Sequence, residues 1–374
     1  MSHASPPLAL DIIGDVHGNL PALLALGRSL GYAVEHGWDH PDGRLPVFLG
    51  DLVDRGPYSL GSAELVMGLV EAGQAACLMG NHEYNLLAWA LQLPGWERPK
   101  RSNGATAEDV AARPARWRPV LEGFARLPLA VDLPDLRLVH ASWHRPSLDA
   151  LAAAGRTRDA VSLAGDGGRA EALAAIAAAV RVPAVFTPTV APPVAAAALG
   201  GLGVVEGLSA SGRGEPDQPH EILMKGHERP VTEPFADADG HLRHDARVTW
   251  WREDDPHVPR DKPIVVGHYW NLPPELGVEA PHWAPPWPSG HPNLRAWWQT
   301  LGPRLAPEGR VPWTGDVLCV DFNGYGKFLG DRACVGAVRW PEREVVWATA
   351  PLVTAEAGAP EASWRPVAGR RDPE

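Results

Sequence analysis

Short apolar runs and amphipathic stretches alternate along the N-terminal part of the chain. Leu8–Ile13, Leu45–Leu49 and Ala75–Met79 are apolar runs, and each is followed at once by a glycine. Such runs, closed by glycine, are typical of buried strands in a parallel sheet. The stretches between them, from Asn19 to about Leu30 and from Ser62 to Glu71, place apolar residues on one helical face. We therefore expect an α/β fold with two consecutive strand–helix–strand units.

Later apolar runs extend this pattern into the C-terminal half. Val317–Phe322 and Ala333–Trp340 alternate between apolar and polar positions around Asn323-Gly324, and Val345–Trp347 repeats the alternation. A period of two predicts half-buried strands, and the turn between the first two predicts an antiparallel hairpin. Further strands are expected at Leu136–Val139, Arg247–Trp251 and Lys262–Val266.

Three segments interrupt the strands and helices. Pro94–Pro119 is rich in Pro, Arg and Trp, which predicts a surface loop with helical pieces. Residues 147–203 are dominated by alanine, with a helical pattern at Arg169–Val180, and predict an Ala-rich helical insertion or cap. Residues 356–374 are rich in Pro, Gly and charges and predict a frayed tail. We expect a single domain over residues 1–374, with a core formed by residues 8–146 and 204–355.

Composition narrows the class of protein. The 374 residues carry 34 basic and 45 acidic side chains, a formal net charge of −11, which disfavours binding to a nucleic-acid duplex. Phosphorylated substrates stay open, because a metal site can dominate the local field. The 3 cysteines are too few and too scattered for a disulfide framework or a zinc ribbon. The strand pattern begins at Leu8, which leaves no room for a signal peptide, and no apolar stretch predicts a membrane span, so a cytoplasmic protein is expected.

Polar side chains that can bind metals follow the expected strands directly. Asp15 and His17 stand two positions apart after the first strand, so both point the same way in an extended or turning segment. Other strands are followed by Asp51, Asn81, His140 and His268. Because ligands gather at the carboxyl ends of parallel strands, the repetition predicts a metal-binding rim.

This set of side chains suits two divalent metal ions. The ligands expected for the first ion are Asp15, His17 and Asp51. Those expected for the second are Asp51, which bridges the two ions, Asn81, His140 and His268, with His227 as a competitor of His268. Mixed carboxylate, carboxamide and imidazole ligands favour Mn, Fe or Zn over Ca, and we expect Mn first, with Mg also open. Two such ions about 4 Å apart clamp a phosphoryl group and generate a hydroxide nucleophile near neutral pH.

Three neighbouring residues have expected roles beyond metal binding. His82 adjoins Asn81 and is suited to protonate the leaving oxygen as a general acid. Asp54 follows closely after Asp51 and could hold one ring nitrogen of His82, which would fix its tautomer. Arg55 offers a planar guanidinium for two phosphate oxygens. The expected activity is hydrolysis of a phosphate ester or phosphoanhydride bond.

Three motifs together resemble the signatures of calcineurin-like metallophosphoesterases. They are Gly14-Asp15-x-His17-Gly18, Gly50-Asp51-x-Val53-Asp54-Arg55-Gly56 and Gly80-Asn81-His82-Glu83. More narrowly, they resemble the phosphoprotein phosphatase branch, which includes protein serine/threonine phosphatases and bacterial symmetrical diadenosine tetraphosphatases. The resemblance covers about Leu8–Arg145 and, more loosely, Lys262–Trp340. It implies a four-layer α-β-β-α sandwich and the same assignment of metal ligands, acid pair and phosphate-binding arginine.

Departures from the family pattern leave the substrate open. His140-Ala141 stands where protein phosphatases of this branch have a His-Gly-Gly turn, which favours dinucleotide hydrolases, whereas Glu83 favours protein phosphatases. A dinucleotide site needs stacking surfaces, and the aromatic residues beside expected ligands could supply them or pack in the core. These residues are Trp143, Tyr269 and Trp270.

Several activities therefore compete. The substrate could be a phosphoprotein, a dinucleoside polyphosphate or a cyclic nucleotide, and Arg145 is the candidate for the family's second phosphate-binding arginine. A different class is a non-catalytic metal-dependent binding module. Such a module should have lost its catalytic groups, but His82, Asp54 and Arg55 are all present, which favours an enzyme.

Overall fold

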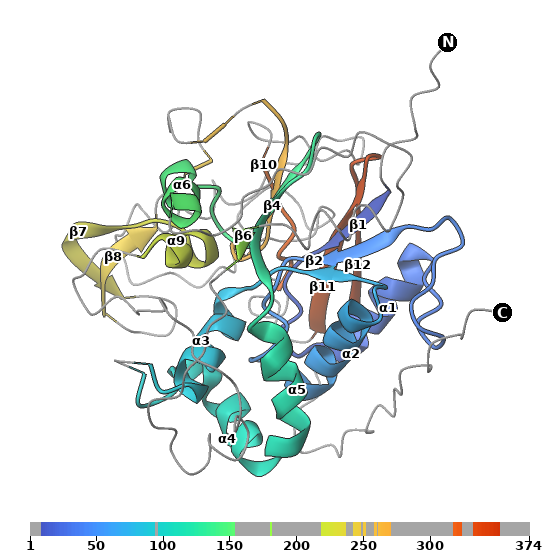
Figure 1. Cartoon of the computed structure of the whole chain (residues 1–374), viewed down its shortest axis with the longest axis horizontal. Coiled ribbons are helices and arrows are strands. Elements are labelled where there is room, and N and C mark those ends of the chain that lie inside the picture. Colours follow the sequence, from blue (N-terminus) through green and yellow to red (C-terminus); the bar gives the residue numbers. More distant parts are fainter. Residues whose placement is uncertain are drawn as a thin grey trace.

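Two five-stranded sheets form the centre of the computed structural model of this chain (Figure 1). The structure describes residues 9–93, 96–153, 180–181, 218–236, 242–247, 250–251, 258–259, 261–270, 317–323 and 332–351. The first sheet contains, in spatial order, β12 (Glu344–Pro351), β11 (Arg332–Trp340), β1 (Leu10–Ile13), β2 (Leu45–Phe48) and β3 (Ala76–Cys77). The second contains β10 (Val317–Cys319), β9 (Ile264–Val266), β5 (Arg137–Val139), β4 (Pro128–Asp132) and β6 (Val180–Arg181).

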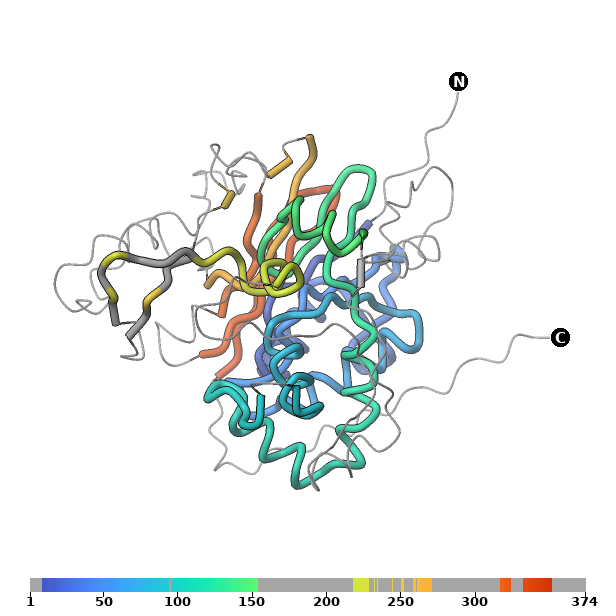
Figure 2. The backbone as a smooth tube through the Cα atoms, turned by 60° about the vertical axis from the view of Figure 1, so that its left-hand side comes forward, coloured from blue at the N-terminus to red at the C-terminus, as the bar shows by residue number. Residues whose placement is uncertain are grey.

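Strand–helix–strand units build the first sheet, as the sequence predicts. β1, β2 and β3 pair in parallel, and they are connected by α1 (Leu20–Leu30) and α2 (Ser59–Glu71). Pro21 lies in the first turn of α1, where its missing N–H is not needed, and Gly31 ends the helix with a left-handed backbone. β11 joins the same sheet antiparallel to β1, so segments from both ends of the described chain lie side by side (Figure 2).

Apolar side chains from both sheets form one buried layer between them. Leu10 and Ile12 of β1 belong to the same cluster as Leu138 of β5 and Val265 of β9. Ile13 of β1 belongs instead to the cluster that includes the apolar face of α1. The period of two along β1 therefore divides its apolar residues between the layer of sheets and the layer of helices.

Helices also cover the outer face of the second sheet. α6 (Arg145–Ala153) and α9 (Pro219–Lys225) pack on each other, and α9 contacts β4. Leu148 of α6 and Leu223 of α9 are buried in the same cluster as Val139 of β5. This arrangement completes helix, sheet, sheet and helix layers, and it confirms the expected mixed α/β sandwich of the metallophosphoesterase type. β7 (Glu228–Ala236) and β8 (Leu242–Arg247) form a separate two-stranded hairpin.

The predicted C-terminal hairpin is wrong. β10 pairs in parallel with β9 in the second sheet, whereas β11 pairs with β1 and β12 in the first. The N–H of Val320 continues the second-sheet pairing by bonding to the oxygen of Val266. Alternation alone predicts that a strand exists, but it cannot say which sheet supplies its partner. β12 confirms the expected third strand near Val345–Trp347.

Two other expectations also need correction. Of the strand predicted at Arg247–Trp251, Arg247 ends β8, residues 248 and 249 lie outside the described residues, and Trp250 and Trp251 lie in a buried turn instead of a strand. The segment expected as a surface loop with helical pieces does contain helices, but these form most of it and it is partly buried. It contains the 3₁₀ helix η1 (Arg101–Asn103), α4 (Gly104–Ala112) and α5 (Pro114–Phe124). Pro114 begins α5, where proline is tolerated, so this proline marks a helix start rather than a loop, and Pro119 lies inside the same helix.

The predicted insertion is described only at its edges. Residues 147–153 belong to α6, and Val180–Arg181 forms β6, which pairs with β4. Residues 154–179 and 182–217, with most of the helix predicted at Arg169–Val180, lie outside the described residues, as does the predicted tail. The division into core, insertion and tail therefore stays a prediction. Among the described helices, none is long and apolar enough to cross a membrane.

Candidate metal centre

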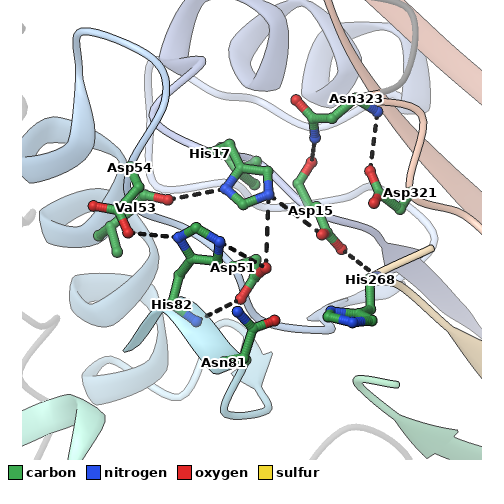
Figure 3. Close-up of polar contacts among 12 residues, drawn as sticks. Asp15, His17, Asp51, Val53, Asp54, Asn81, His82, His268, Asp321 and Asn323 are labelled. Carbon is green, nitrogen blue, oxygen red and sulfur yellow. Dashed lines mark hydrogen bonds and ion pairs between the residues drawn. The ribbon is translucent and has the colours of Figure 1, made fainter. Parts of the chain in front are cut away.

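Loops that follow strands of both sheets converge on one cluster of polar side chains (Figure 3). The first sheet contributes Asp15 and His17 after β1, Asp51 after β2, and Asn81 at the start of α3 (Asn81–Ala90) after β3. The second sheet contributes His140 after β5 and His268 after β9. All six predicted ligands are buried except Asn81, which is half-buried. The structure thus brings these six predicted ligands together.

The backbone is strained where these side chains emerge. Eight non-glycine residues in the described chain have positive φ, and five of them are predicted site residues. These five are His17, Asp51, Asp54, Arg55 and His268. Strained backbone is typical of functional sites, where the surrounding structure holds it in place. Gly80 and Gly267 supply space, since a side-chain carbon at either position would overlap with Asp51 or Asp15, respectively.

Asp15 and His17 present unsatisfied atoms to the expected first metal site. His17 Nδ1 lies 3.0 Å from the oxygen of Val53, and because a carbonyl only accepts, Nδ1 carries the proton. His17 Nε2 is then a lone pair, 3.5 Å from Asp15 Oδ2 and 3.6 Å from Asp51 Oδ2. Within the described residues, Asp15 Oδ2 and His17 Nε2 have no hydrogen-bond partner although both are buried. A cation would satisfy both atoms, so the donor set fits a metal ion.

His140 is oriented in the same manner toward the second site. Its Nδ1 lies 2.8 Å from the oxygen of Leu49, which leaves Nε2 facing Asn81 Oδ1 at 3.3 Å and Asp51 Oδ1 at 3.4 Å. Ligand atoms of Asp51, His140 and His268 lie within 4.8 Å of one another. His17, Asp51 and His82 form a second such group. Because Asp51 belongs to both groups, its carboxylate is placed to bridge two ions.

The electrostatics of the cluster point to a bound cation. Burial, followed by the charge of Asp51, raises the pKa of Asp15 to about 6. Burial, followed by Arg55, lowers the pKa of His17 to about 3, which keeps its imidazole neutral as a metal ligand requires. Burial opposes ionisation of Asp51 as well, but the nearby His140 holds the pKa of Asp51 well below its usual range. Carboxylates this close and this buried need positive charge beside them, which divalent metals supply.

His82 and Asp54 are paired next to this cluster. His82 Nδ1 lies 2.5 Å from Asp54 Oδ2, and its Nε2 lies 3.8 Å from Asp51 Oδ2. The backbone N–H of His82 donates to Asp51 Oδ1 at 2.9 Å, which fixes the start of α3 against the bridging carboxylate. The geometry expected for the acid pair is present. One imidazole nitrogen is held by a carboxylate, and the other faces the centre.

The two arginines proposed for phosphate binding have different surroundings. The guanidinium carbon of Arg55 lies 5.0 Å from the ring centroid of Trp270, a half-buried residue that follows His268 and Tyr269. Arg55 also acts on the pKa values of Asp15 and His17, which places its charge near the first metal site. Arg145 begins α6, is exposed and pairs with Asp149 on the same helix at 3.4 Å. Its proposed role in phosphate binding stays a prediction.

The remaining sequence candidates lie in packed surroundings. Trp143 and Tyr269 are buried, and Trp250 Nε1 donates to the hydroxyl of Tyr269 at 3.0 Å, so both aromatic residues belong to the core. His227 packs edge-on against His144, with ring centroids 4.2 Å apart. His227 belongs to neither metal-binding group found among the described residues, whereas His268 belongs to one.

Glu83 has a role that sequence reasoning missed. Its Oε2 accepts the backbone N–H of Asp51 at 2.7 Å and that of Gly80 at 3.1 Å, and its Oε1 accepts the N–H of Leu52 at 2.7 Å. Burial, followed by the charge of Asp51, raises the pKa of Glu83 to about 7. One carboxyl group therefore ties the turn after β2 to the turn after β3. The sequence signal was only that Glu83 adjoins two site residues.

Asp321 and Asn323 are further residues that the sequence did not reveal. Asp321 follows β10 and is fully buried, and burial, followed by Asp15, raises its pKa to about 8. Its Oδ1 accepts the N–H of Asn323, while Oδ2 has no hydrogen-bond partner in the described part of the chain. The side-chain N–H of Asn323 donates to the backbone oxygen of Asp15 at 2.5 Å (Figure 3). Its Oδ1 accepts from the side-chain amide of Asn19 at 3.1 Å. The available signal in the sequence was that Asp321 directly follows the apolar residues Val317–Val320. We did not use this signal, because the run was assigned to a hairpin.

Comparison with known proteins supports a family for the N-terminal part. Residues 8–160 match the family of calcineurin-like phosphoesterases. Bis(5'-nucleosyl)-tetraphosphatase PrpE, named asymmetrical, from Geobacillus sp. (strain WCH70) is 47% identical over 148 residues, which are 37% of this chain and 59% of that protein. The protein of the same name from Halalkalibacterium halodurans is 50% identical over 76 residues, 20% of this chain and 31% of that protein. The chain therefore spans less than two thirds of the length of each relative.

A solved structure resembles the chain over a longer range. A protein serine/threonine phosphatase from Saccharomyces cerevisiae, with similarity to human phosphatase PP5, matches 94% of this chain and 82% of its own chain. The sequence identity is 14% and the TM-score 0.40.

Proposed function

We propose that this protein hydrolyses phosphate ester or phosphoanhydride bonds at a centre of two divalent metal ions, since residues 8–160 match the calcineurin-like phosphoesterase family. The observation that carries the proposal is the pair of metal-binding groups that share Asp51. Two bound cations would clamp the phosphoryl group and lower the pKa of water enough to provide a hydroxide nucleophile. As expected from the sequence, we also propose that the metal is manganese and that the protein is cytoplasmic.

The chain's own residues have separate tasks in this proposal. Asp15 and His17 would hold the first ion, Asn81, His140 and His268 would hold the second, and Asp51 would contribute to both sites. Asp54 fixes the tautomer of His82, whose Nε2 donates a proton to the leaving oxygen. Arg55 orients the phosphoryl oxygens through its planar fork.

For the substrate we favour a dinucleoside tetraphosphate. The relatives that match 20% and 37% of this chain are named bis(5'-nucleosyl)-tetraphosphatases, and the half-buried Trp270 beside Arg55 offers an aromatic face next to the proposed phosphate-binding group. The relatives are named asymmetrical, whereas the motifs suggested the symmetrical branch, so the position of cleavage is part of the test. A non-catalytic binding module is disfavoured, because it would not need a buried His82–Asp54 pair at 2.5 Å.

One assay panel tests the proposal. Purified protein is stripped of metal, reloaded with Mn, Mg, Zn or Fe, and given diadenosine tetraphosphate, a phosphopeptide, a cyclic nucleotide or p-nitrophenyl phosphate. We expect metal-dependent hydrolysis, fastest for the tetraphosphate. Two nucleoside diphosphates would indicate symmetrical cleavage, and a triphosphate with a monophosphate would indicate asymmetrical cleavage. Faster release from the phosphopeptide would assign a protein phosphatase instead, and full activity after exhaustive demetallation would contradict the metal mechanism.

A further inference from the structure

Buried polar groups from three different segments of the chain surround Asp54. Its Oδ2 accepts from His82 Nδ1 at 2.5 Å and from the side-chain amide of Asn103, and its Oδ1 accepts from the hydroxyl of Thr106. The backbone N–H of Asp54 donates to Ser59 Oγ at 2.8 Å. All five side chains are buried, so water does not compete with these bonds.

The two added donors come from the segment whose sequence suggested a surface loop. Asn103 ends η1 and Thr106 lies in the first turn of α4, so this part of the chain reaches back to the turn after β2. The amide of Asn103 also lies 3.3 Å from the backbone oxygen of His82, so it contacts both members of the acid pair. Thr106 Oγ1 lies 3.3 Å from Ser59 Oγ, which joins the two sides of the arrangement.

A carboxylate held at both oxygens has a fixed plane. If only His82 bonded to Asp54, the carboxylate could rotate about its terminal torsion, which is broad for aspartate. Thr106 on Oδ1 and Asn103 on Oδ2 remove that freedom and direct the remaining acceptor site of Oδ2 at the imidazole. The orientation of His82, and with it the direction of Nε2 toward the centre, then depends on residues that contact no substrate.

We propose that Thr106 and Asn103 are positioning residues that hold Asp54, and through it His82, in the orientation required for proton donation to the leaving oxygen. The inference rests on the proposed function, and it adds two residues to the acid machinery that the family motifs in this sequence do not contain. The competing explanation is that both residues merely satisfy a buried carboxylate and stabilise the fold.

Epistasis with His82 separates these explanations. Thr106→Val removes the hydroxyl at nearly constant shape, and Asn103→Ala provides a second variant should the first fold poorly. For an alkyl phosphate, each variant should lower kcat about tenfold, as expected for losing a hydrogen bond to a charged group, with little change in KM. For p-nitrophenyl phosphate, whose leaving group needs little protonation, the loss should be less than about threefold. Adding Thr106→Val to His82→Asn should lower kcat by less than about twofold further.

Matched controls guard against a general packing effect. Thr106→Ser keeps the hydroxyl and should restore turnover to within about threefold of the wild type. Ser62→Ala removes another buried hydroxyl from α2, one turn beyond Ser59, and should leave the ratio of the two substrates unchanged. Thermal unfolding and metal content are measured for every variant, so that turnover is compared between folded and equally loaded proteins.

The outcomes separate failure of this inference from failure of the proposed function. Suppose that His82→Asn lowers kcat mainly for the alkyl phosphate. If Thr106→Val then lowers kcat equally for both substrates, or lowers it by its full factor when combined with His82→Asn, the positioning role is wrong. If the wild type hydrolyses no phosphate ester, the proposed function fails, and proton NMR still tests the contact itself. The Nδ1 proton of His82 is protected from exchange with water and should give a downfield signal in the wild type. This signal should broaden in Thr106→Val and return in Thr106→Ser. An unchanged signal in Thr106→Val overturns the inference.

Discussion

The strand ends of the first sheet and those of the second contribute to the candidate centre in different ways. The first sheet supplies its residues densely, from Asp15 to His82, through turns whose backbone is held at positive φ. The second supplies single side chains that are far apart in the sequence, namely His140, His268 and Asp321. In the proposed mechanism, the first region therefore supplies the bridging ligand, the acid pair and the phosphate-binding arginine. The second region closes the cluster from the opposite side.

Two buried carboxylates show the same difference electrostatically. Asp51 lies beside the imidazoles of His140, His82 and His17, which hold its pKa well below the usual range although burial opposes this. Asp321 is equally buried, but its strongest charged neighbour is Asp15, and its pKa is raised to about 8. Burial alone does not make a ligand. A carboxylate that lies beside several imidazoles is stabilised in its ionised form. Only the ionised form can bridge two metal ions.

Asp51→Asn should have the largest effect, because it breaks the one contribution that serves both metal-binding groups. We expect turnover to fall by more than about 10⁴-fold, as when a central catalytic group is removed. Metal binding at both sites should weaken. Asp42→Asn, at an aspartate whose side chain is 81% exposed, is the control and should change neither property. Wild-type turnover in the Asp51 variant would show that the bridge is assigned wrongly.

His82→Asn should have the second-largest effect on turnover, and this effect should be limited to the chemical step. Loss of a general acid lowers turnover by about 10²–10⁴-fold, and the loss should shrink for p-nitrophenyl phosphate. Metal content should stay near normal, since Asn81 supplies the ligand from this turn. His82 also lies in a group of potential ligands with His17 and Asp51, so a variant that loses one metal would identify His82 as a ligand instead.

Asp321→Asn tests how far the second region supports the first metal site. Its carboxylate interacts with that of Asp15 and also acts on the pKa of His17, so removing its charge should alter metal affinity more than folding. We expect the affinity of one of the two ions to fall by about 10–100-fold, the usual effect of residues just outside a metal's ligands. Titration calorimetry of the metal-free protein measures this. Unchanged affinity for both ions would limit Asp321 to a structural role with Asn323.

Glu83→Gln should have the smallest effect on chemistry and a measurable effect on stability. A glutamine cannot accept all three backbone N–H groups that Glu83 accepts from Asp51, Leu52 and Gly80. Leaving a buried donor without an acceptor should lower the free energy of unfolding by about 1–3 kcal/mol. Urea unfolding of the metal-free protein provides the measurement. Glu71→Gln, at the exposed end of α2, should change stability by less than about 0.5 kcal/mol. Equal stability of the two variants would contradict the role given to Glu83.

The N-terminal half of the fold and site could be predicted from the sequence because its information is local. In that half, each apolar run, its closing glycine and the following ligand lie within a few residues, and β1 to β3 pair in parallel as expected. The second-sheet partner of β10 could not be predicted, because strand alternation does not name the sheet that a strand joins.

The contacts of Asn103 and Thr106 could not be predicted for a different reason. Their target, Asp54, lies 49 and 52 positions away in the sequence, and nothing in the Pro- and Arg-rich segment indicates a buried role. Sequence patterns indicated the residues that we propose to hold metal and substrate. Asn103 and Thr106, which support Asp54, could be found only from the contacts in the folded structure.

The number of metal ions bound per chain tests the central claim most directly. Wild-type protein, stripped with chelator, reloaded with Mn and freed of excess metal, is analysed by elemental mass spectrometry beside Asp51→Asn prepared in parallel. The shared position of Asp51 predicts about two ions per chain in the wild type and fewer than one in the variant. One ion or none in the wild type, or two in both proteins, would contradict a dinuclear centre bridged by Asp51.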